Sequence, residues 1–167
     1  MFTLRSHRPG DIGYITYRHA IFYSQAYGFD TTFDAYVASG LSQFVMQYDP
    51  PKEHLWVAEE ETTHVGSIAI VKKEESVAQL RWFLVEQQAR GRGLGKKLLH
   101  EAIAFCERNN YQKIILWTIS NLYAARKLYE LFDFQVITNK THQIWGQELT
   151  EELWEIELNR VAVDKKY

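Results

Sequence analysis

The chain has little cysteine, little proline and little net charge, and these shortages exclude several classes of protein. Cys106 is the single cysteine, so no internal disulfide can form and a reducing, cytoplasmic setting is favoured. Its place on the apolar side of an expected helix indicates an inert core thiol rather than a nucleophile. The formal net charge of −2 gives no electrostatic basis for general binding to nucleic acid.

Long apolar runs are also missing from the sequence. No apolar stretch approaches the roughly 20 residues that a membrane span needs, and no signal peptide precedes the first charged residues. We therefore expect no membrane partner. Hydrophobic residues still make up 46% of the 167 residues, enough for a substantial core. We expect one domain over residues 1–160 and a C-terminal tail, residues 161–167, that frays.

A glycine-rich basic segment, residues 90–97 (RGRGLGKK), is the most informative feature that is present. It joins an apolar run at residues 80–85 to a helical pattern that starts near Leu94, in the order strand, loop, helix. Glycine lets the backbone make unusual turns and approach a ligand closely. The free amides of the helix start, the helix dipole and the basic side chains together predict an anion site that suits a phosphate.

The spacing of this segment excludes two familiar phosphate-binding motifs. Gly95-Lys96 is followed by Lys97, where a P-loop has the serine or threonine that holds magnesium. The glycines stand at relative positions 1, 3 and 5, whereas a dinucleotide fingerprint needs 1, 3 and 6. Taken alone, the segment could also be only a steric turn at a strand–helix corner. We predict no metal site.

Hydrophobic periodicity predicts a mixed, mostly antiparallel α/β sheet of about seven strands flanked by helices. Asp11, after Pro9-Gly10, is the expected N-cap of the first helix. Helices are expected over residues 12–27, 33–48, 94–108 and about 122–132. Strands are expected over residues 2–6, 55–59, 65–72, 77–85, 113–119, 134–138 with 144–145, and 153–158.

Two motifs give the chain a resemblance to a known family. Arg90-x-x-Gly93-x-Gly95 resembles the pyrophosphate-binding signature of the GNAT superfamily, the acetyl-CoA-dependent N-acetyltransferases. Residues 121–134 (NLYAARKLYELFDF) resemble the second motif of that family, with Asp133 where the family usually has glycine. The resemblance covers about residues 4–158. It implies the GNAT fold and direct transfer of an acetyl group from acetyl-CoA to a primary amine, of a small molecule or a protein, in a ternary complex.

The N-terminal stretch carries a closer likeness. Residues 5–11 (RSHRPGD) through residues 27–30 (YGFD) are similar to the acetyltransferase half of bacterial proteins in which such a domain follows a MarR-type winged-helix repressor. This likeness makes a DNA-associated regulator a third class of function. The slightly acidic charge and the lack of a helix-turn-helix segment weigh against it, and we expect no nucleic-acid partner.

The resemblance also implies where the cosubstrate binds. The pantetheine arm would lie between two diverging strands, along the backbone of Phe83, Leu84 and Val85. Backbone amides from Arg90 to Gly95 would hold the pyrophosphate, and basic side chains would add charge. The residues of this segment are Arg90, Gly91, Arg92, Gly93, Leu94, Gly95 and Lys96. The alternative for the basic side chains is a solvated turn.

Tyr129 aligns with the tyrosine that family members use to protonate the departing thiolate. A phenol has an unperturbed pKa near 10, so it is a competent proton donor at neutral pH. The alternative is that Tyr129 only packs in the core. Asn121 would bind the cofactor arm or cap its helix. Arg126 could reach a phosphate or be an exposed solubilising residue.

The general base and the acceptor site are less defined by the sequence. Gln79 lies near the register of the glutamate that some family members use, and glutamine cannot accept a proton; Glu86, Glu59, His64 and a water chain stay open. Candidate acceptor-binding residues are Tyr27, Asp30 and Trp82, within a wider set of mostly aromatic residues that also includes Arg81. Such aromatic clusters are commoner in cores. A non-catalytic coenzyme A sensor is the alternative function. The sequence leaves a homodimer open.

Overall fold

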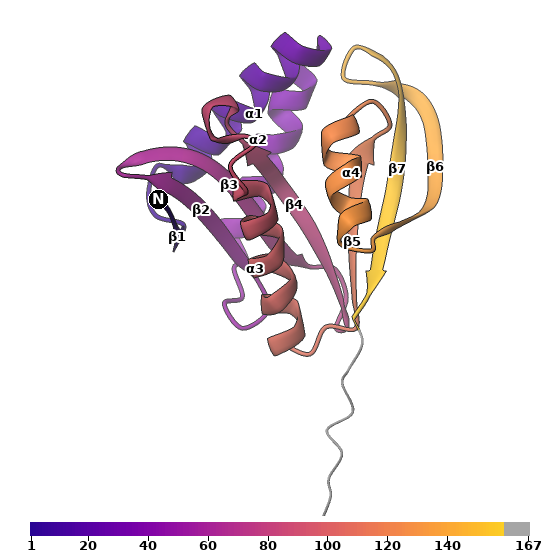
Figure 1. Ribbon diagram of the computed structural model, residues 1–167. Coiled ribbons are helices and arrows are strands. Elements are labelled where there is room, and N and C mark those ends of the chain that lie inside the picture. Colours follow the sequence, from indigo (N-terminus) through magenta and orange to yellow (C-terminus); the bar gives the residue numbers. More distant parts are fainter. Residues whose placement is uncertain (159–167) are drawn as a thin grey trace, which may run out of the picture.

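The computed structural model describes residues 1–158, and its strands form one seven-stranded sheet in the order β1-β2-β3-β4-β5-β7-β6 (Figure 1). The strands are β1 (Phe2–Ser6), β2 (His54–Glu60), β3 (Thr63–Lys72), β4 (Val77–Val85), β5 (Lys113–Ile119), β6 (Gln135–Ile144) and β7 (Gln147–Glu157). Strands β1 to β4 pair antiparallel as a meander, as their short polar connections predict.

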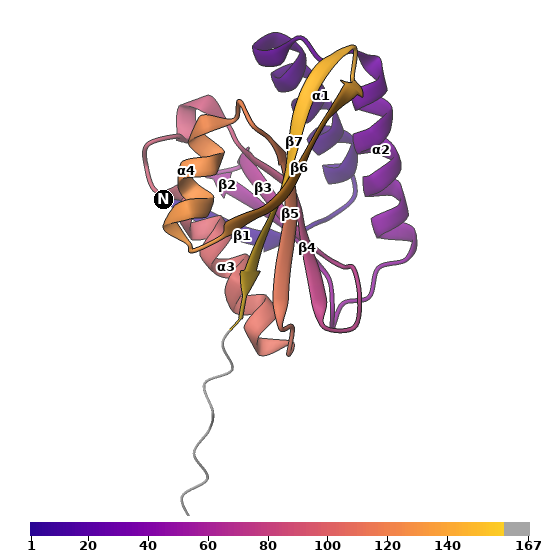
Figure 2. The same ribbon diagram turned by 90° about the vertical axis from the view of Figure 1, so that its right-hand side faces the viewer.

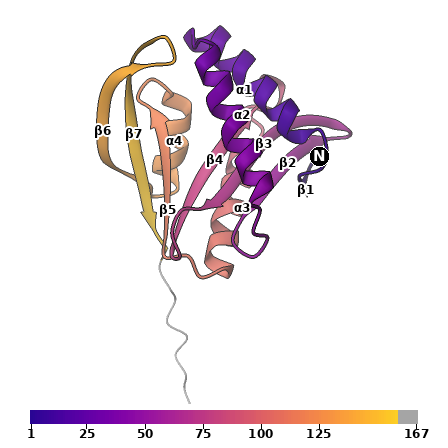
Figure 3. The same cartoon turned by 180° about the vertical axis from the view of Figure 1, so that it is seen from behind.

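Helices cover both faces of the sheet. Helices α1 (Asp11–Tyr27) and α2 (Thr31–Met46) lie on one face, and α3 (Leu94–Arg108) and α4 (Tyr123–Leu131) lie on the other (Figures 2 and 3). A short 3-10 turn, η1 (Gln87–Ala89), leads from β4 into the glycine-rich segment before α3. The segment therefore stands where the sequence predicts it, between a strand and a helix.

Each face of the sheet has its own buried core. In β2, Leu55 and Val57 face the α1–α2 layer, whereas Trp56 and Ala58 face the α3–α4 layer, following the period of two of a strand. The apolar stripe of α3, with Leu98 among its buried residues, completes the second core. Because both faces are covered, the central strands read as nearly continuous apolar runs.

The parallel strands β4 and β5 pair over only part of their length. Its register runs from Val77, opposite Lys113, to Gln79, opposite Ile115, and pairing ends there. Both strands continue beyond that point, so they diverge and leave an opening in the middle of the sheet (Figure 1). This opening positions the site described below.

A β-bulge in β4 lies at the edge of the opening. Ser67 of β3 stands opposite Leu84 and Ala69 opposite Arg81, so β4 carries one residue more than β3 between these pairs. Trp82 takes a positive φ of 47° in the bulge, and its carbonyl accepts a hydrogen bond from Ser67 Oγ at 2.8 Å. A bulge re-aims side chains and frees backbone groups from the ladder.

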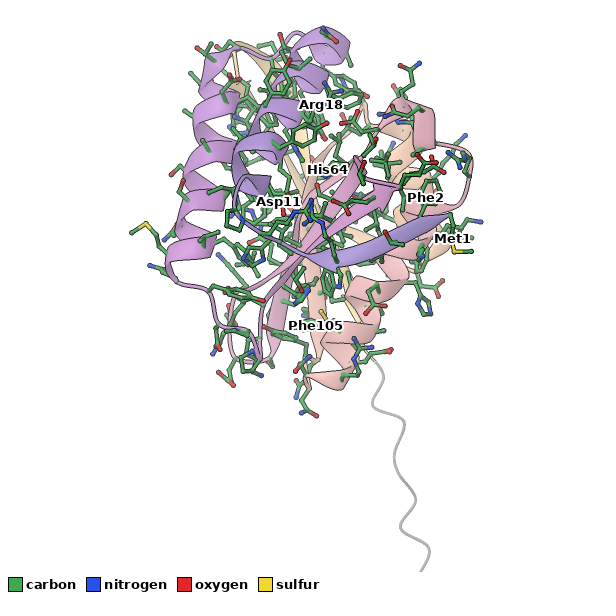
Figure 4. All side chains as sticks on the ribbon, turned by 90° about the vertical axis from the view of Figure 1, so that its left-hand side faces the viewer. Met1, Phe2, Asp11, Arg18, His64 and Phe105 are labelled. Carbon is green, nitrogen blue, oxygen red and sulfur yellow. The ribbon has the colours of Figure 1, made fainter. Side chains whose placement is uncertain are left out.

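Two helix boundaries differ from the sequence-based expectations. Asp11 is the first residue of α1 rather than its N-cap, because its carboxylate accepts hydrogen bonds from Arg5 and from the Arg8 backbone N–H, both at 2.7 Å. Helix α2 begins and ends two residues earlier than predicted, because the Asp30 side chain caps it by accepting from the Thr32 N–H. Figure 4 shows Asp11 near His64, with Arg18 farther along α1.

The β6–β7 hairpin is longer than the sequence indicates. The polar residues 139–143 continue β6 and pair with Glu148 to Glu152 of β7; they are polar because β6 is a solvent-exposed edge strand. The hairpin turns at Trp145-Gly146, where both residues have positive φ. The predicted tail, residues 161–167, and the predicted domain end at residue 160 lie outside the described residues.

Candidate active site

The start of α3 forms a cradle of backbone groups. Gly91 and Gly93 have positive φ of 71° and 83°, and Gly93 is the N-cap of α3 without any side-chain cap. A Cβ added at either glycine would meet nothing within 4 Å. Left-handed backbone geometry, rather than crowding, is what these positions require of glycine. The uncapped helix start and the open space above it suit an anion.

A groove of about 480 Å³ runs from this cradle to the opening in the sheet. One side is the end of β4 with the cradle, and the other is α4 with the C-terminal part of α1. Of the predicted cofactor-binding residues, those that line the groove are Phe83, Leu84, Val85, Arg90, Gly91, Gly93, Leu94, Gly95 and Lys96. The groove thus has a basic, backbone-rich end and an apolar body, as a nucleotide with a long flexible arm requires.

The two arginines of the cradle behave differently. Arg90 lines the groove, donates from Nε to the Val85 carbonyl at 2.9 Å and lies over the Phe22 ring, 4.9 Å from its centroid. Arg92 instead forms two hydrogen bonds with the Glu60 carboxylate, at 2.7 and 2.5 Å, and its side chain does not line the groove. The prediction that the Arg92 side chain adds charge to the site therefore does not fit, because Glu60 already neutralises it.

A second, smaller cavity of about 140 Å³ lies in the opening between β4 and β5. It shares Tyr23, Phe83, Leu122 and Ala125 with the groove, so the two spaces adjoin. Its walls come from α1, α2 and the loop between them, from β4, β5 and α4, and from the β6–β7 hairpin. Many of the lining side chains are aromatic, among them Phe29, Phe33, Tyr36, Trp82, Trp117 and Trp145.

Tyr129 lines this cavity from α4, with only 5% of its surface exposed. Its ring packs against Phe134 and Trp154, with centroids 5.9 Å away in each case. Burial raises the pKa of Tyr129 above the ordinary phenol value, so the hydroxyl stays protonated at neutral pH. A buried, protonated phenol beside Phe83, where the groove and the cavity meet, can give up a proton to a group that arrives there.

His19 is a cavity residue that the sequence reasoning missed. Its Nδ1 lies 2.9 Å from the Ile15 carbonyl, which can only accept, so Nδ1 carries the hydrogen and the neutral ring has its lone pair on Nε2. Burial lowers the pKa of His19 to about 4. The only hint in the sequence is its spacing of four residues from Tyr23 on α1, which predicts a shared helix face and no function.

The residues left open as general bases lie away from the cavity. Glu86 is held by Arg18 through hydrogen bonds of 2.6 and 2.8 Å, and Glu59 by Arg5 at 2.8 Å. Burial lowers the pKa of His64, and its Nε2 lies 2.9 Å from the Gly66 carbonyl. Gln79 does line the cavity, but it is an amide. None of the carboxylates and histidines that the sequence leaves open as a general base therefore lines the cavity.

The remaining predicted site residues do not lie together in one space. Trp82 lines the cavity, whereas Tyr27 lines the groove. Asp30 caps α2 and does not line either space. Arg126 pairs with Glu152 at 3.1 Å, so its side chain is directed to β7 rather than to the groove. Asn121 is exposed and does not cap α4, whose N-cap is Leu122.

Two further properties of the described residues bear on the class of protein. No three of their histidine, cysteine, aspartate or glutamate side chains lie together as a metal site would need. No helix within residues 1–158 is long and apolar enough to cross a membrane.

The opened β4–β5 pair, the bulge and the cradle before α3 define a known class of transferase fold. The Acetyltransferase (GNAT) family matches residues 12–134, which is most of the chain. The chain therefore belongs to the GNAT acetyltransferase family, and the predicted fold is confirmed.

Individual proteins show the same relationship. An N-acetylaspartate synthetase of Xenopus tropicalis is 35% identical over 107 residues, which is 64% of this chain and 39% of that protein. A GNAT-family acetyltransferase of Staphylococcus aureus Mu50 aligns over 95% of this chain and 100% of its own, with a TM-score of 0.79 at 18% identity. An acetyltransferase of Salmonella typhimurium, solved with its cofactor acetyl-CoA, aligns over 97% and 96%, with a TM-score of 0.74 at 18% identity.

The chain spans only about two fifths of the length of that first relative, so the similarity concerns the shared domain. The similarity of the N-terminal stretch to repressor-fused acetyltransferases stays a prediction.

Proposed function

We propose that this protein is an N-acetyltransferase that moves an acetyl group from acetyl-CoA directly to a primary amine within a ternary complex. The observation that carries the proposal is that the groove and the cavity adjoin at the opening between β4 and β5, with Tyr129 facing the cavity. A cosubstrate in the groove and an amine in the cavity would meet there without an enzyme-bound acetyl intermediate. The buried Cys106, whose pKa is raised by burial, is not placed to act as a nucleophile.

The residues of the groove fit acetyl-CoA. The amides from Gly91 to Gly95 would hold its diphosphate with support from the helix dipole, and Arg90 and Lys96 would add charge. The pantetheine arm would lie along the backbone of Phe83 to Val85, beyond the point at which β4 stops pairing with β5. One of these amides would then donate to the acetyl carbonyl and stabilise the oxyanion.

The transfer needs little beyond alignment because a thioester is already activated. The amine nitrogen attacks the acetyl carbon, a C–N bond forms, and the C–S bond breaks with its electron pair on sulfur. Tyr129 gives its hydroxyl proton to the thiolate. The nitrogen gives up its own proton to solvent, from which Tyr129 is reprotonated. The neutral His19 would accept a hydrogen bond from the amine through Nε2.

Thiol release from acetyl-CoA in the presence of an amine panel tests this function. The wild type should release coenzyme A with an amine present, and Tyr129→Phe should lower kcat about 100-fold or more while leaving the KM for acetyl-CoA unchanged. Tyr123→Phe is the matched control, because Tyr123 lies on the same helix and is exposed. Equal kcat in the two variants would remove Tyr129 from the mechanism.

A coenzyme A sensor without turnover is the second candidate. It is favoured by one observation: Glu59 and Glu86, the carboxylates that the sequence leaves open as bases, are held by arginines and do not line the cavity. Glu151 does line the cavity, but its carboxylate has His142 Nε2 at 2.5 Å. Binding of acetyl-CoA without thiol release for any amine would select it. A cytoplasmic location and a homodimer stay predictions.

A further inference from the structure

The arginines of the described residues show an uneven pattern of pairing. Those that lie within ion-pair distance of an aspartate or glutamate are Arg5, Arg8, Arg18, Arg92, Arg108 and Arg126. Within residues 1–158, this leaves only Arg81 and Arg90 without a carboxylate partner. Both line the proposed site: Arg90 the groove and Arg81 the cavity. Arg90 is proposed to bind phosphate, and Arg81 has no role assigned so far.

Arg81 is held in the cavity wall by aromatic rings. Its guanidinium carbon lies 4.5 Å from the centroid of the Trp82 ring and 5.6 Å from that of Tyr36. The bulge brings this about, because it lets the consecutive residues Arg81 and Trp82 both face the α1–α2 layer. Stacking fixes the plane of the guanidinium and leaves its edge free for hydrogen bonds.

Helix α2 makes room for this guanidinium at Gly40. A Cβ at position 40 would lie 2.8 Å from Arg81 Nη2 and 3.1 Å from Trp82 Cζ2. Glycine inside a helix costs about 1 kcal/mol relative to alanine. The absence of a side chain at this position is therefore what allows the Arg81 head group to sit against α2.

Two charged residues stand among the described lining residues of the cavity, Arg81 and Glu151, and no ion pair joins them. The one carboxylate among its described lining residues is Glu151, which has His142 Nε2 at 2.5 Å and Lys140 Nζ at 3.9 Å. Glu151 thus has partners of its own, whereas Arg81 has no carboxylate within ion-pair distance. A simple cationic amine would be repelled by Arg81, and an acceptor that brings a carboxylate would complete an ion pair.

The size and lining of the cavity restrict the rest of the acceptor. Its volume of about 140 Å³ is close to that of a site that holds one benzene ring, about 150 Å³. Phe33 and Trp145 pack edge to face there, with centroids 4.9 Å apart, and such walls bind apolar and aromatic groups. A ring-sized apolar group fits this space better than a long charged chain.

We propose that the acceptor is an aromatic α-amino acid or a close analogue: an amine with a neighbouring carboxylate and a ring-sized apolar side chain. This deepens the proposed function and rests on it. Arg81 binds the carboxylate through its fork of N–H donors, and the aromatic walls enclose the side chain. The amine is then directed to the junction with the groove, near Phe83 and Tyr129.

Three matched probes test this acceptor class: L-phenylalanine, L-phenylalaninamide and 2-phenylethylamine. They share a ring and an amine, and only the first has a carboxylate. With coenzyme A present, calorimetry should show the tightest binding for L-phenylalanine. With acetyl-CoA, L-phenylalanine should have the highest kcat/KM for thiol release. The Arg81→Met variant keeps the apolar stem of the side chain but loses the charge. It should raise the KM for L-phenylalanine about 10- to 100-fold. The KM for 2-phenylethylamine should change less than about threefold.

Two variants separate binding from structure. Arg81→Lys should restore part of the preference for the carboxylate, because it keeps the charge but not the fork. Arg108→Met, an exposed arginine on α3, should change nothing.

Two outcomes would overturn the inference while leaving the proposed function intact: a wild type that prefers the amide or 2-phenylethylamine, or an Arg81→Met variant that weakens all three probes equally. Absence of thiol release with any amine would instead remove the proposed function. In that case calorimetry still decides about Arg81, since no binding of L-phenylalanine to the coenzyme A complex would overturn the subsite as well.

Discussion

The groove and the cavity are built in different ways, although they adjoin. The groove draws its polar end from consecutive backbone groups between residues 83 and 96, so a short stretch of sequence contains it. The cavity is assembled from side chains of α1, α2 and the loop between them, of β4, β5 and α4, and of the β6–β7 hairpin, which no local pattern brings together. The cosubstrate site can therefore be predicted from one motif, whereas the acceptor site depends on how the whole chain folds.

The largest expected effect concerns the cavity and arises from His19. Its pKa in the folded protein is about 4, below the ordinary value of 6.5, so the unfolded chain binds more protons between these values. Stability is therefore highest above pH 6.5 and falls as the pH drops towards 4, by about 3 kcal/mol from His19 alone. Glu86 and His64 are the charged groups that act on it, in opposite directions.

Urea unfolding between pH 4 and pH 7 measures this dependence. His19→Gln keeps a donor for the Ile15 carbonyl without titrating, so it should flatten the curve. His100→Gln, at an exposed position, is the matched control and should leave the curve unchanged. His7, His54 and His64, whose pKa values are also lowered by burial, supply the slope that remains. An unaltered slope in His19→Gln would contradict the assignment.

The second prediction concerns the groove. Gly93→Val places a β-branched residue at φ 83°, which costs about 1–3 kcal/mol and distorts the cradle. Affinity for acetyl-CoA should fall at least 10-fold by calorimetry. Gly13→Ala, in the open face of α1, is the control and should bind normally. A Gly93→Val variant that is folded by circular dichroism and binds acetyl-CoA as tightly as the wild type would show that the cradle does not hold the diphosphate.

The sequence could predict most of the fold, and the groove, for the same physical reason. Strand and helix periods, and glycines that need positive φ, are local properties of the chain. It could name Arg81 only within a general set of acceptor candidates, and it did not indicate His19, because their roles depend on a bulge and on a helix that packs across the sheet. Arg92 shows the limit within the segment itself: it lies among the basic residues of the segment, but Glu60, 32 residues earlier, takes up its charge.

A smaller effect should follow from Gly40→Ala, and it should reach only the cavity. The new Cβ would displace the Arg81 head group, so the preference for L-phenylalanine over 2-phenylethylamine should fall several-fold. Stability should change by less than about 1 kcal/mol, because the gain in helix propensity opposes the tight contact with Trp82. Thermal unfolding and kcat/KM ratios measure the two quantities. An unchanged ratio would mean that Arg81 does not sense the acceptor.

The smallest effect is expected within the cradle itself. Arg92→Ala breaks an exposed ion pair, so stability should change by less than about 1 kcal/mol and acetyl-CoA affinity by less than about threefold. Arg90→Ala should weaken acetyl-CoA binding by about 10-fold. Calorimetry on the two variants side by side measures the contrast, and equal losses would erase the distinction drawn between these neighbours.

A titration of ¹⁵N-labelled protein with coenzyme A, followed by the backbone amide resonances, tests whether the end of β4 and the cradle before α3 bind the cosubstrate. The account predicts that the largest shifts fall on residues 83–85 and 90–96, with the exposed amides of β6 unaffected. Shifts confined to other surfaces, or none at millimolar coenzyme A, would contradict it.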